Sequence, residues 1–172
     1  VGTVRMYGGI WAFPAGSFDS PYYRVALEKP SPLSPAFDRR YFQSLFNHPT
    51  VEKLPAKAFL ATEQRIPGLG NGVLQDILFR AKIHPRRKIA DLDTDERETL
   101  FTALISILAA MAAGGGRDTE TDLYGCVGGY ATCMSRRTVG LPCSACGALV
   151  RKEAFLGGSI YFCPGCQPRQ QD

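Results

Sequence analysis

The sequence predicts a mainly α-helical fold followed by a four-cysteine zinc-ribbon β-hairpin, with a stray strand at the N-terminal end. Two observations predict this fold class. Apolar residues recur with the 3.6-residue period of buried helices through the middle of the chain. Near the C-terminal end, two Cys-x-x-Cys pairs stand sixteen residues apart, which is typical of a zinc ribbon. We therefore expect three parts, at residues 1–32, 33–138 and 139–172.

The first part is interpreted as the remnant of a β domain and a linker. Residues 1–13 are predicted to form a strand without a partner strand nearby in the sequence, and a lone strand is not stable. We therefore expect this segment to be the end of a larger sheet, and the chain to be the C-terminal part of a longer protein. Residues 14–36 are rich in Pro, Ser and Tyr, and each proline disfavours a helical conformation in the residue before it. They predict an extended spacer.

The second part contains four predicted helices, at residues 38–46, 56–62, 72–81 and from 93 or 94 to 113. The third has apolar side chains at positions i, i+3, i+4 and i+7, and the fourth carries a longer stripe with the same period. Asn71 can cap the third helix with its side chain. Three consecutive glycines end the fourth helix, and the polar, glycine-rich residues 117–142 lead into the zinc ribbon.

The paired cysteines carry the strongest chemical signal in the chain. Each Cys-x-x-Cys places two thiolates on one tight turn, and two such turns can surround a zinc ion tetrahedrally. Because four sulfur ligands leave no open coordination position, the site would hold structure and perform no chemistry. We predict one structural Zn²⁺, and two disulfide bonds in a secreted domain are the alternative. The expected metal ligands are Cys143, Cys146, Cys163 and Cys166.

The sixteen residues between the two pairs predict a β-hairpin. Residues 148–150 and 160–162 are strand-like, and the glycine pair at 157–158 favours a tight turn between them. The metal is expected to keep this ribbon folded.

Composition and charge indicate the setting in which the protein works. No apolar run approaches the ~20 residues of a membrane span, and the first residues lack the basic and apolar regions of a secretory signal. Cys126 and Cys133 have no metal-type spacing, so we expect reduced core thiols in a cytoplasmic protein. The net charge of +4 is weak evidence for a nucleic-acid partner. Five positively charged residues between positions 80 and 88 strengthen this evidence, because they predict a surface that contacts phosphates.

Residues 57–85, KAFLATEQRIPGLGNGVLQDILFRAKIHP, closely resemble the helix–two-turns–helix motif of the formamidopyrimidine-DNA glycosylase / endonuclease VIII family. The PGLGN turn, the acidic Asp76 and the IHP exit match that motif. The GGGRDT stretch and the closing ribbon CSACG and YFCPGCQ match further along the chain, so the resemblance extends over residues 33–167. It implies the DNA-binding C-terminal part of a base-excision-repair DNA glycosylase and AP lyase that acts on damaged bases, located in the bacterial cytoplasm or nucleoid.

The backbone of the PGLGN turn is suited to contact DNA phosphates. It presents backbone N–H groups to a phosphate, and glycines such as Gly70 permit close approach of the backbone. The resemblance implies that Asn71 contacts the phosphate beside the damaged nucleotide and that Lys57 reaches the DNA backbone. Without the resemblance, Asn71 is a helix cap and Lys57 an ordinary solvated lysine. Gln64 and Asp76 are expected to brace the turn.

The chain departs from the family pattern in two places. Family members attack the sugar C1′ with the amine of an N-terminal proline that is followed by a glutamate, whereas this sequence begins Val1-Gly2. We therefore expect no catalytic residue and no catalysis by this chain alone. Many relatives carry a phosphate-gripping arginine near the hairpin tip, at the position of Gly158. Arg151 and Lys152, on the preceding strand, are expected to supply phosphate contacts instead.

Two main hypotheses follow. In the first, the helical motif and the hairpin clamp the phosphates of damaged double-stranded DNA, and the protein is a monomer that does not bind membranes. The alternative is a non-catalytic zinc-ribbon protein that binds DNA or RNA on the same scaffold, which the missing tip arginine favours. A third and weaker interpretation is a protein–protein interaction ribbon without affinity for nucleic acid.

Overall fold

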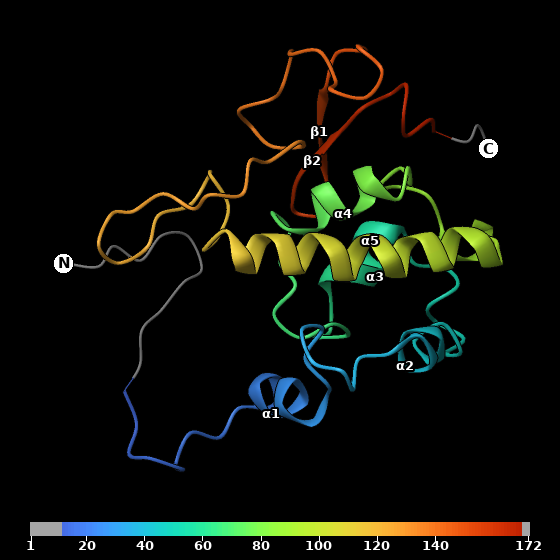
Figure 1. Ribbon diagram of the computed structural model, residues 1–172. Helices are drawn as coiled ribbons and strands as arrows, with labels where there is room; N and C mark the ends of the chain where they lie inside the picture. Colours follow the sequence, from blue (N-terminus) through green and yellow to red (C-terminus); the bar gives the residue numbers. More distant parts are fainter. Residues whose placement is uncertain (1–11, 170–172) are drawn as a thin grey trace.

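The computed structural model describes residues 12–169. Within them the helices are α1 (Pro21–Glu28), α2 (Arg39–Ser44), α3 (Ala56–Ala61), α4 (Leu74–Arg80), a short 3₁₀ turn η1 (Ile89–Asp91) and α5 (Thr94–Ala113). The strands β1 (Arg151–Phe155) and β2 (Gly158–Phe162) form an antiparallel hairpin. The predicted fold class, mainly helical with a C-terminal hairpin, is confirmed (Figure 1). The strand expected at residues 1–13 lies almost wholly outside the described residues, and Ala12 and Phe13 belong to no element.

Helix α5 is the longest element and crosses the middle of the molecule, with α4 and the hairpin to one side and α1 and α2 to the other (Figure 1). Its start is fixed by a capping box: Asp93 accepts the N–H of Glu96, and the Glu96 carboxylate accepts the N–H of Asp93. The predicted apolar stripe is buried at Leu100, Leu104 and Met111. The expected cap and the expected core face of this helix are therefore confirmed.

The main core gathers side chains from α2, α3, α4 and α5. Aromatic rings form its centre, where Phe42 packs edge-on against Phe46 and Phe59. Helix α4 contributes the predicted stripe of Leu74, Ile77 and Leu78, all fully buried. A second, smaller cluster lies under the zinc ribbon and contains only four buried residues, Met134, Cys143, Val150 and Cys163.

The extended conformation predicted for residues 14–36 is wrong over Pro21–Glu28, where α1 forms. Pro21 occupies the first helical position, where no backbone N–H is needed and where the proline φ is already helical. A proline can therefore begin a helix, although it disfavours the helical conformation in the residue before it. The segment is also anchored, since Lys29 Nζ donates to the carbonyl of Gln64 at 2.9 Å.

The hairpin is displaced from its predicted position. Phe155 pairs with Gly158, so the two-residue turn is Leu156-Gly157, one residue earlier than the predicted glycine pair. Both turn residues are left-handed, with φ of 49° and 69°, as a tight hairpin turn of this length requires. Residues 148–150 were expected to form the first strand, but β1 begins at Arg151. They pair instead with the residues just before the cysteine turn: Leu149 forms an isolated bridge with Pro142, and the Val150 N–H donates to the Leu141 carbonyl at 3.0 Å.

The loop between α5 and the ribbon is held by a buried carboxylate. Asp76, 2% exposed, accepts the N–H groups of Met134 at 2.6 Å and of Cys133 at 3.2 Å. It was expected to brace the PGLGN turn, and it fastens this distant loop to α4 instead. Burial, the largest effect, raises the pKa of Asp76, while the two N–H donors lower it. Cys126 in the same loop is exposed, so the prediction that it is a core thiol is wrong.

Across residues 12–169, no helix combines the length and the apolar character needed to cross a membrane.

Leu104→Ala should lower the free energy of unfolding by about 2–5 kcal/mol, because the side chain is fully buried and its loss leaves a cavity in the main core. Urea unfolding followed by circular dichroism measures this change. Leu123→Ala is the matched control, since Leu123 is 96% exposed and its truncation should change stability by less than ~0.5 kcal/mol. Equal effects of the two substitutions would contradict the assignment of the core.

Candidate metal centre and nucleic-acid interface

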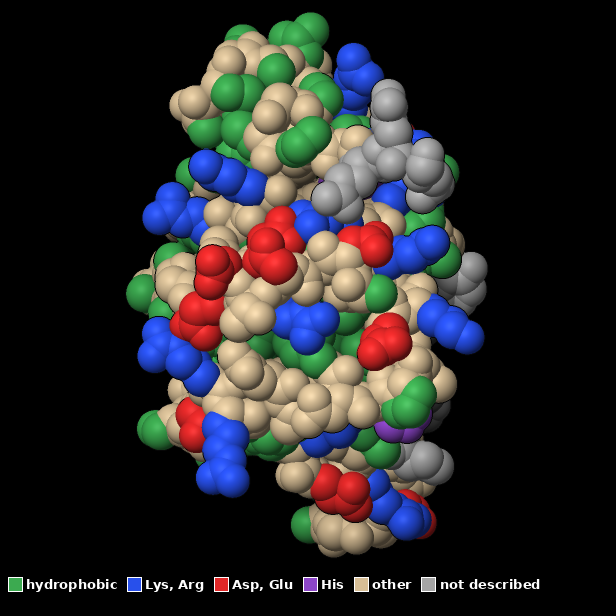
Figure 2. All heavy atoms as spheres, turned by 90° about the vertical axis from the view of Figure 1, so that its right-hand side faces the viewer, with side chains coloured by type: hydrophobic (Ala, Val, Ile, Leu, Met, Phe, Trp, Pro, Cys, Tyr) green, Lys and Arg blue, Asp and Glu red, His purple; other side chains and the backbone are tan. Residues whose placement is uncertain are grey.

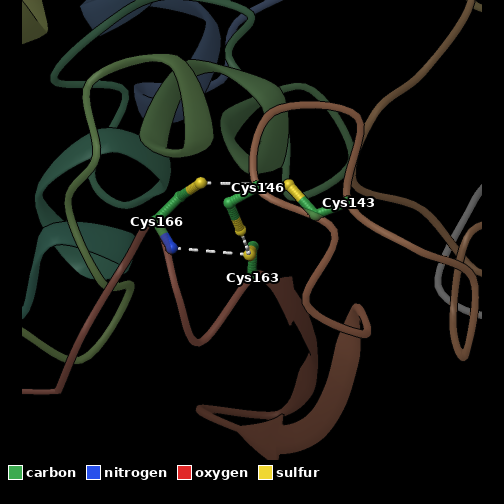
Figure 3. A group of neighbouring side chains, drawn as sticks. All are labelled: Cys143, Cys146, Cys163 and Cys166. Carbon is green, nitrogen blue, oxygen red and sulfur yellow. Dashed lines mark hydrogen bonds between the residues drawn. The ribbon is translucent and has the colours of Figure 1, made fainter.

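The four predicted ligand cysteines point toward one another between the turn before β1 and the turn after β2 (Figure 3). Their sulfur atoms all lie within 4.8 Å of one another, with 3.3 Å between Cys146 and Cys163 and 3.9 Å between Cys143 and Cys166. Zn–S bonds of ~2.3 Å in a tetrahedron place sulfurs about 3.8 Å apart, whereas a disulfide needs ~2.05 Å. The cluster thus fits one structural Zn²⁺ better than two disulfide bonds, because all four sulfurs converge on one point and these two separations are too long for an S–S bond.

The thiols of the cluster differ in how readily they ionise. The backbone N–H of Ala148 is the largest of the effects that lower the pKa of Cys146, to about 7, so this thiol ionises readily. Burial raises the pKa of Cys163 and of Cys166, because a buried thiolate loses its hydration. A zinc ion would bind the sulfurs as thiolates, because metal binding releases the thiol protons.

The ribbon is fastened to the helices by polar side chains. Gln167, fully buried, donates to the Ile83 carbonyl at 2.8 Å and accepts the Cys163 N–H at 3.0 Å. Arg86 donates to Glu153 and to the Ala154 carbonyl, both at 3.0 Å. These bonds join the residues after α4 to both ends of the hairpin, so the hairpin is held against the helices along its length.

The basic stretch at residues 80–88 is not one free phosphate-binding surface. Arg86 is paired with Glu153, and Arg87 is paired with Glu96 and is largely buried. On the face shown in Figure 2, Lys and Arg side chains alternate with Asp and Glu and form no single basic patch. This stretch therefore offers fewer free positive charges for binding phosphates than the sequence predicts.

A groove of about 590 Å³ opens between α3, the PGLGN turn and the hairpin turn, and we call it the tip groove. It is lined by Lys57, Ala58, Ala61, Thr62, Asn71, Leu156, Gly157, Gly158, Ser159 and Tyr161. The hairpin turn closes one wall, and the absence of a side chain at Gly158 brings its backbone close to both polar groups. A Cβ there would lie 3.4 Å from Lys57 Nζ and 3.6 Å from Asn71 Nδ2.

Lys57 is not a solvated lysine. The residue is 5% exposed, and its ammonium donates to the Phe155 carbonyl at the hairpin tip. Burial, followed by the nearby Arg86 charge, lowers the pKa of Lys57 from the ordinary lysine value. The side chain therefore joins α3 to the hairpin turn at the edge of the tip groove.

Asn71 is not the cap of α4, because the helix begins after Val73 without any side-chain cap. Its Nδ2 instead donates to the Ser159 carbonyl on β2 at 3.1 Å, while the side chain stays exposed. The preceding turn is braced by Gln64, which accepts the Gly68 N–H at 3.1 Å, as predicted. Asn71 thus bridges the turn and the hairpin.

The other three predicted phosphate-binding residues do not line the tip groove. Gly70 is exposed in the PGLGN turn but does not line the groove. Arg151 and Lys152 are exposed at the opposite end of the hairpin, paired with Phe162 and Tyr161. A strand advances ~3.3 Å per residue, so Lys152 lies roughly 10 Å from the tip. The structure therefore brings together Lys57 and Asn71 but not the two strand cations.

Gln75 is a site residue that the sequence analysis missed. It is 1% exposed on α4 and bonds to both Asn71 and β2. The sequence carried one signal: Gln75 follows Asn71 by four residues, which places the two on one side of the helix entry. Its partners on β2 lie more than eighty residues away in the sequence, so no local pattern indicates them.

Residues 29–122, more than half of the chain, match the family model of the formamidopyrimidine-DNA glycosylase H2TH domain. The chain belongs to this family. Two relatives named formamidopyrimidine-DNA glycosylase, from Gloeobacter violaceus and Thermus thermophilus, are 32% and 35% identical to it over 98% and 95% of this chain. The chain spans about 60% of the length of these curated relatives.

Solved structures of the formamidopyrimidine-DNA glycosylase family share the fold. The crystal structure of the MutM (Fpg) protein from Thermus thermophilus superimposes with a TM-score of 0.72 at 32% identity, over 83% of this chain and 54% of that one. The Lactococcus lactis Fpg in complex with DNA that contains an abasic site gives a TM-score of 0.70 at 28% identity, over 87% and 55%. The predicted family resemblance is confirmed.

Removal of the metal should unfold the ribbon and leave most helix content intact, because the cluster beneath the ribbon holds only four buried residues and the helices have their own core. A chelator titration followed by far-ultraviolet circular dichroism and by amide hydrogen exchange of β1 and β2 measures both. Cys143→Ser should have the same effect, and Cys126→Ser, outside the cluster, should have none. Persistent protection of β1 and β2 after metal removal would contradict the structural role.

Proposed function

We propose that this chain holds the sugar–phosphate backbone of damaged double-stranded DNA in the tip groove, as the DNA-binding C-terminal portion of a formamidopyrimidine-DNA glycosylase. One observation carries the proposal. The hairpin tip meets Lys57 and Asn71 in a single groove, although Phe155 and Ser159 lie 98 and 88 residues further along the chain than their respective partners. The Lactococcus lactis relative binds DNA with an abasic site, which supports the same partner class.

The donors around the tip groove suit a phosphodiester. Asn71 Nδ2 uses one hydrogen on Ser159, and its second hydrogen remains available to a phosphate oxygen. Lys57 donates to one carbonyl and has three N–H bonds, so it too retains donors. Within residues 12–169, the backbone N–H groups of Gly70, Asn71 and Gly72 donate to no protein carbonyl. Several donors thus lie side by side, with a cation among them.

The charge of the tip groove comes from Lys57, the one ionisable cation among its described lining residues. A hairpin tip without an arginine offers no charge-assisted bond, and such bonds are about twice as strong as neutral ones. The Phe155 carbonyl draws the Lys57 ammonium to the tip, so the lysine carries positive charge to the place where the tip itself has none. The strand cations Arg151 and Lys152 are proposed to contact phosphates further along the duplex.

The proposal extends to the organisation of the chain. Residues 33–138 and 139–172 are proposed to act together, since the tip groove forms only where the two parts meet, and residues 1–32 precede them. The protein is proposed to act as a monomer in the cytoplasm of a bacterium, where the DNA lies. This assignment gives the chain a role in holding DNA and assigns no bond-breaking step to the residues of the tip groove.

Lys57→Met should weaken binding to duplex DNA and reduce the slope of log K against log [salt] by about 0.9, because one phosphate contact is lost. Fluorescence anisotropy at several salt concentrations measures both. Asn71→Ala should weaken binding and leave the slope unchanged, and its effect on stability should stay below ~1–2 kcal/mol because Asn71 is exposed. Lys53→Met is the control, an exposed lysine outside the tip groove. Equal slopes for Lys57→Met and Lys53→Met would refute the role of Lys57.

A second candidate function is a non-catalytic module that recognises backbone shape in DNA or RNA. The neutral hairpin tip at Gly158 favours it, because a tip without charge grips a lesion phosphate less strongly. The two functions differ in their preference for helix form, since A-form RNA and B-form DNA space their phosphates differently.

Competition between duplex DNA and duplex RNA of the same sequence discriminates between the two functions. We expect DNA to bind more tightly, because the family acts on DNA. A single-stranded competitor in the same assay controls for simple charge attraction. Equal affinity for both duplexes would favour the shape-reading module.

A further inference from the structure

Strand β2 has an open edge that faces α4, because the described hairpin contains only two strands. Ser159 and Tyr161 direct backbone groups to this edge, away from β1. The side-chain amide of Gln75 meets both: its oxygen accepts the Tyr161 N–H at 3.0 Å, and its nitrogen donates to the Ser159 carbonyl at 3.2 Å. The amide therefore occupies the place that a peptide group of a third strand would take.

The same amide also binds the PGLGN turn. Gln75 Nε2 donates to the Asn71 carbonyl at 2.9 Å and lies 3.4 Å from Asn71 Oδ1. Because the Tyr161 N–H requires an oxygen acceptor, the nitrogen of Gln75 must face the carbonyls of Asn71 and Ser159. The orientation of this buried amide, 1% exposed, is thus fixed by its partners.

The fixed amide of Gln75 in turn orients Asn71. The Ser159 carbonyl accepts hydrogen bonds from both Gln75 Nε2 and Asn71 Nδ2. The bond from Gln75 fixes the position of this carbonyl, and Asn71 then donates to it. Asn71 Nδ2 must then face β2, and this orientation also fixes the direction of its second N–H bond. Gln75 itself is too buried to contact DNA.

We propose that Gln75 is a positioning residue for phosphate binding, which locks the PGLGN turn to the edge of β2 and so holds Asn71 and the hairpin tip as one binding surface. The inference rests on the proposed function of the tip groove and adds to it the residue that sets its geometry. Loss of the amide leaves the fold and the charge of the groove in place but frees Asn71 and the tip to move independently.

Gln75→Met tests this role, since methionine is close in length and volume but cannot form the three bonds. The control is Gln43→Met, the same substitution at an exposed glutamine on α2, outside the tip groove and the ribbon. Binding to duplex DNA is measured by fluorescence anisotropy across salt concentrations on the full, zinc-loaded chain, with zinc content checked for each variant.

Gln75→Met should weaken binding by about tenfold, the effect of losing one well-placed hydrogen bond to a charged group, with an unchanged salt slope. Gln43→Met should bind as the unaltered chain does. In an Asn71→Ala background, Gln75→Met should cost less than about twofold, since it acts through Asn71. Additive losses, or binding by Gln75→Met equal to that of the unaltered chain, would overturn the inference.

A measurement without DNA separates this inference from the proposed function. The side-chain amide resonances of Asn71 in ¹⁵N NMR spectra should shift in Gln75→Met and stay unchanged in Gln43→Met. If the unaltered chain fails to bind duplex DNA, the proposed function is wrong, while the resonances still report whether Gln75 orients Asn71. Unshifted Asn71 resonances in Gln75→Met would reject the positioning role directly.

Discussion

The bonds from four sulfur atoms to one zinc ion are the constraint on which the binding surface depends. An isolated two-stranded hairpin is at best marginally stable in water, and the apolar cluster beneath this one contains only four buried residues. The metal supplies the cross-link that this small core cannot replace. The hairpin can then reach the helices with its tip at a defined place, so that residues distant in sequence share one groove.

Contact between the hairpin and the helices is made through main-chain carbonyls of the tip region. Lys57 binds the Phe155 carbonyl, Arg86 binds that of Ala154, and Asn71 binds that of Ser159. In these three bonds the donors lie on the helical side and the acceptors on the hairpin, whereas the Tyr161 N–H donates in the opposite direction, to Gln75. Phe79 also packs against the apolar cluster beneath the ribbon. Lys57 and Asn71 therefore keep N–H groups that the hairpin does not use, and an anion in the tip groove can accept hydrogen bonds from them.

Local patterns predicted the elements of the fold, and long-range contacts decided the details of the site. The spacing of apolar residues and the Asp93 cap located α5, and the cysteine spacing located the metal cluster. Two expectations failed for the same reason. Asn71 was expected to cap a helix and Lys57, on local grounds, to be solvated, but each side chain has a stronger partner on the hairpin, which no sequence period reveals. The missed α1 shows instead that a proline can begin a helix.

The hairpin turn has a mechanical consequence for the whole ribbon. Leu156 adopts a left-handed backbone with φ of 49°, which costs a non-glycine residue roughly 1 kcal/mol, and its side chain is 57% exposed and so gains little from burial. Left to itself, such a turn would relax by slipping one residue so that glycines filled both left-handed positions. The observed pairing of the strands is therefore held by contacts outside the turn, among them the bonds of Lys57 to Phe155 and of Gln75 to Tyr161. The helices thus select the strand alignment that the turn by itself would not favour.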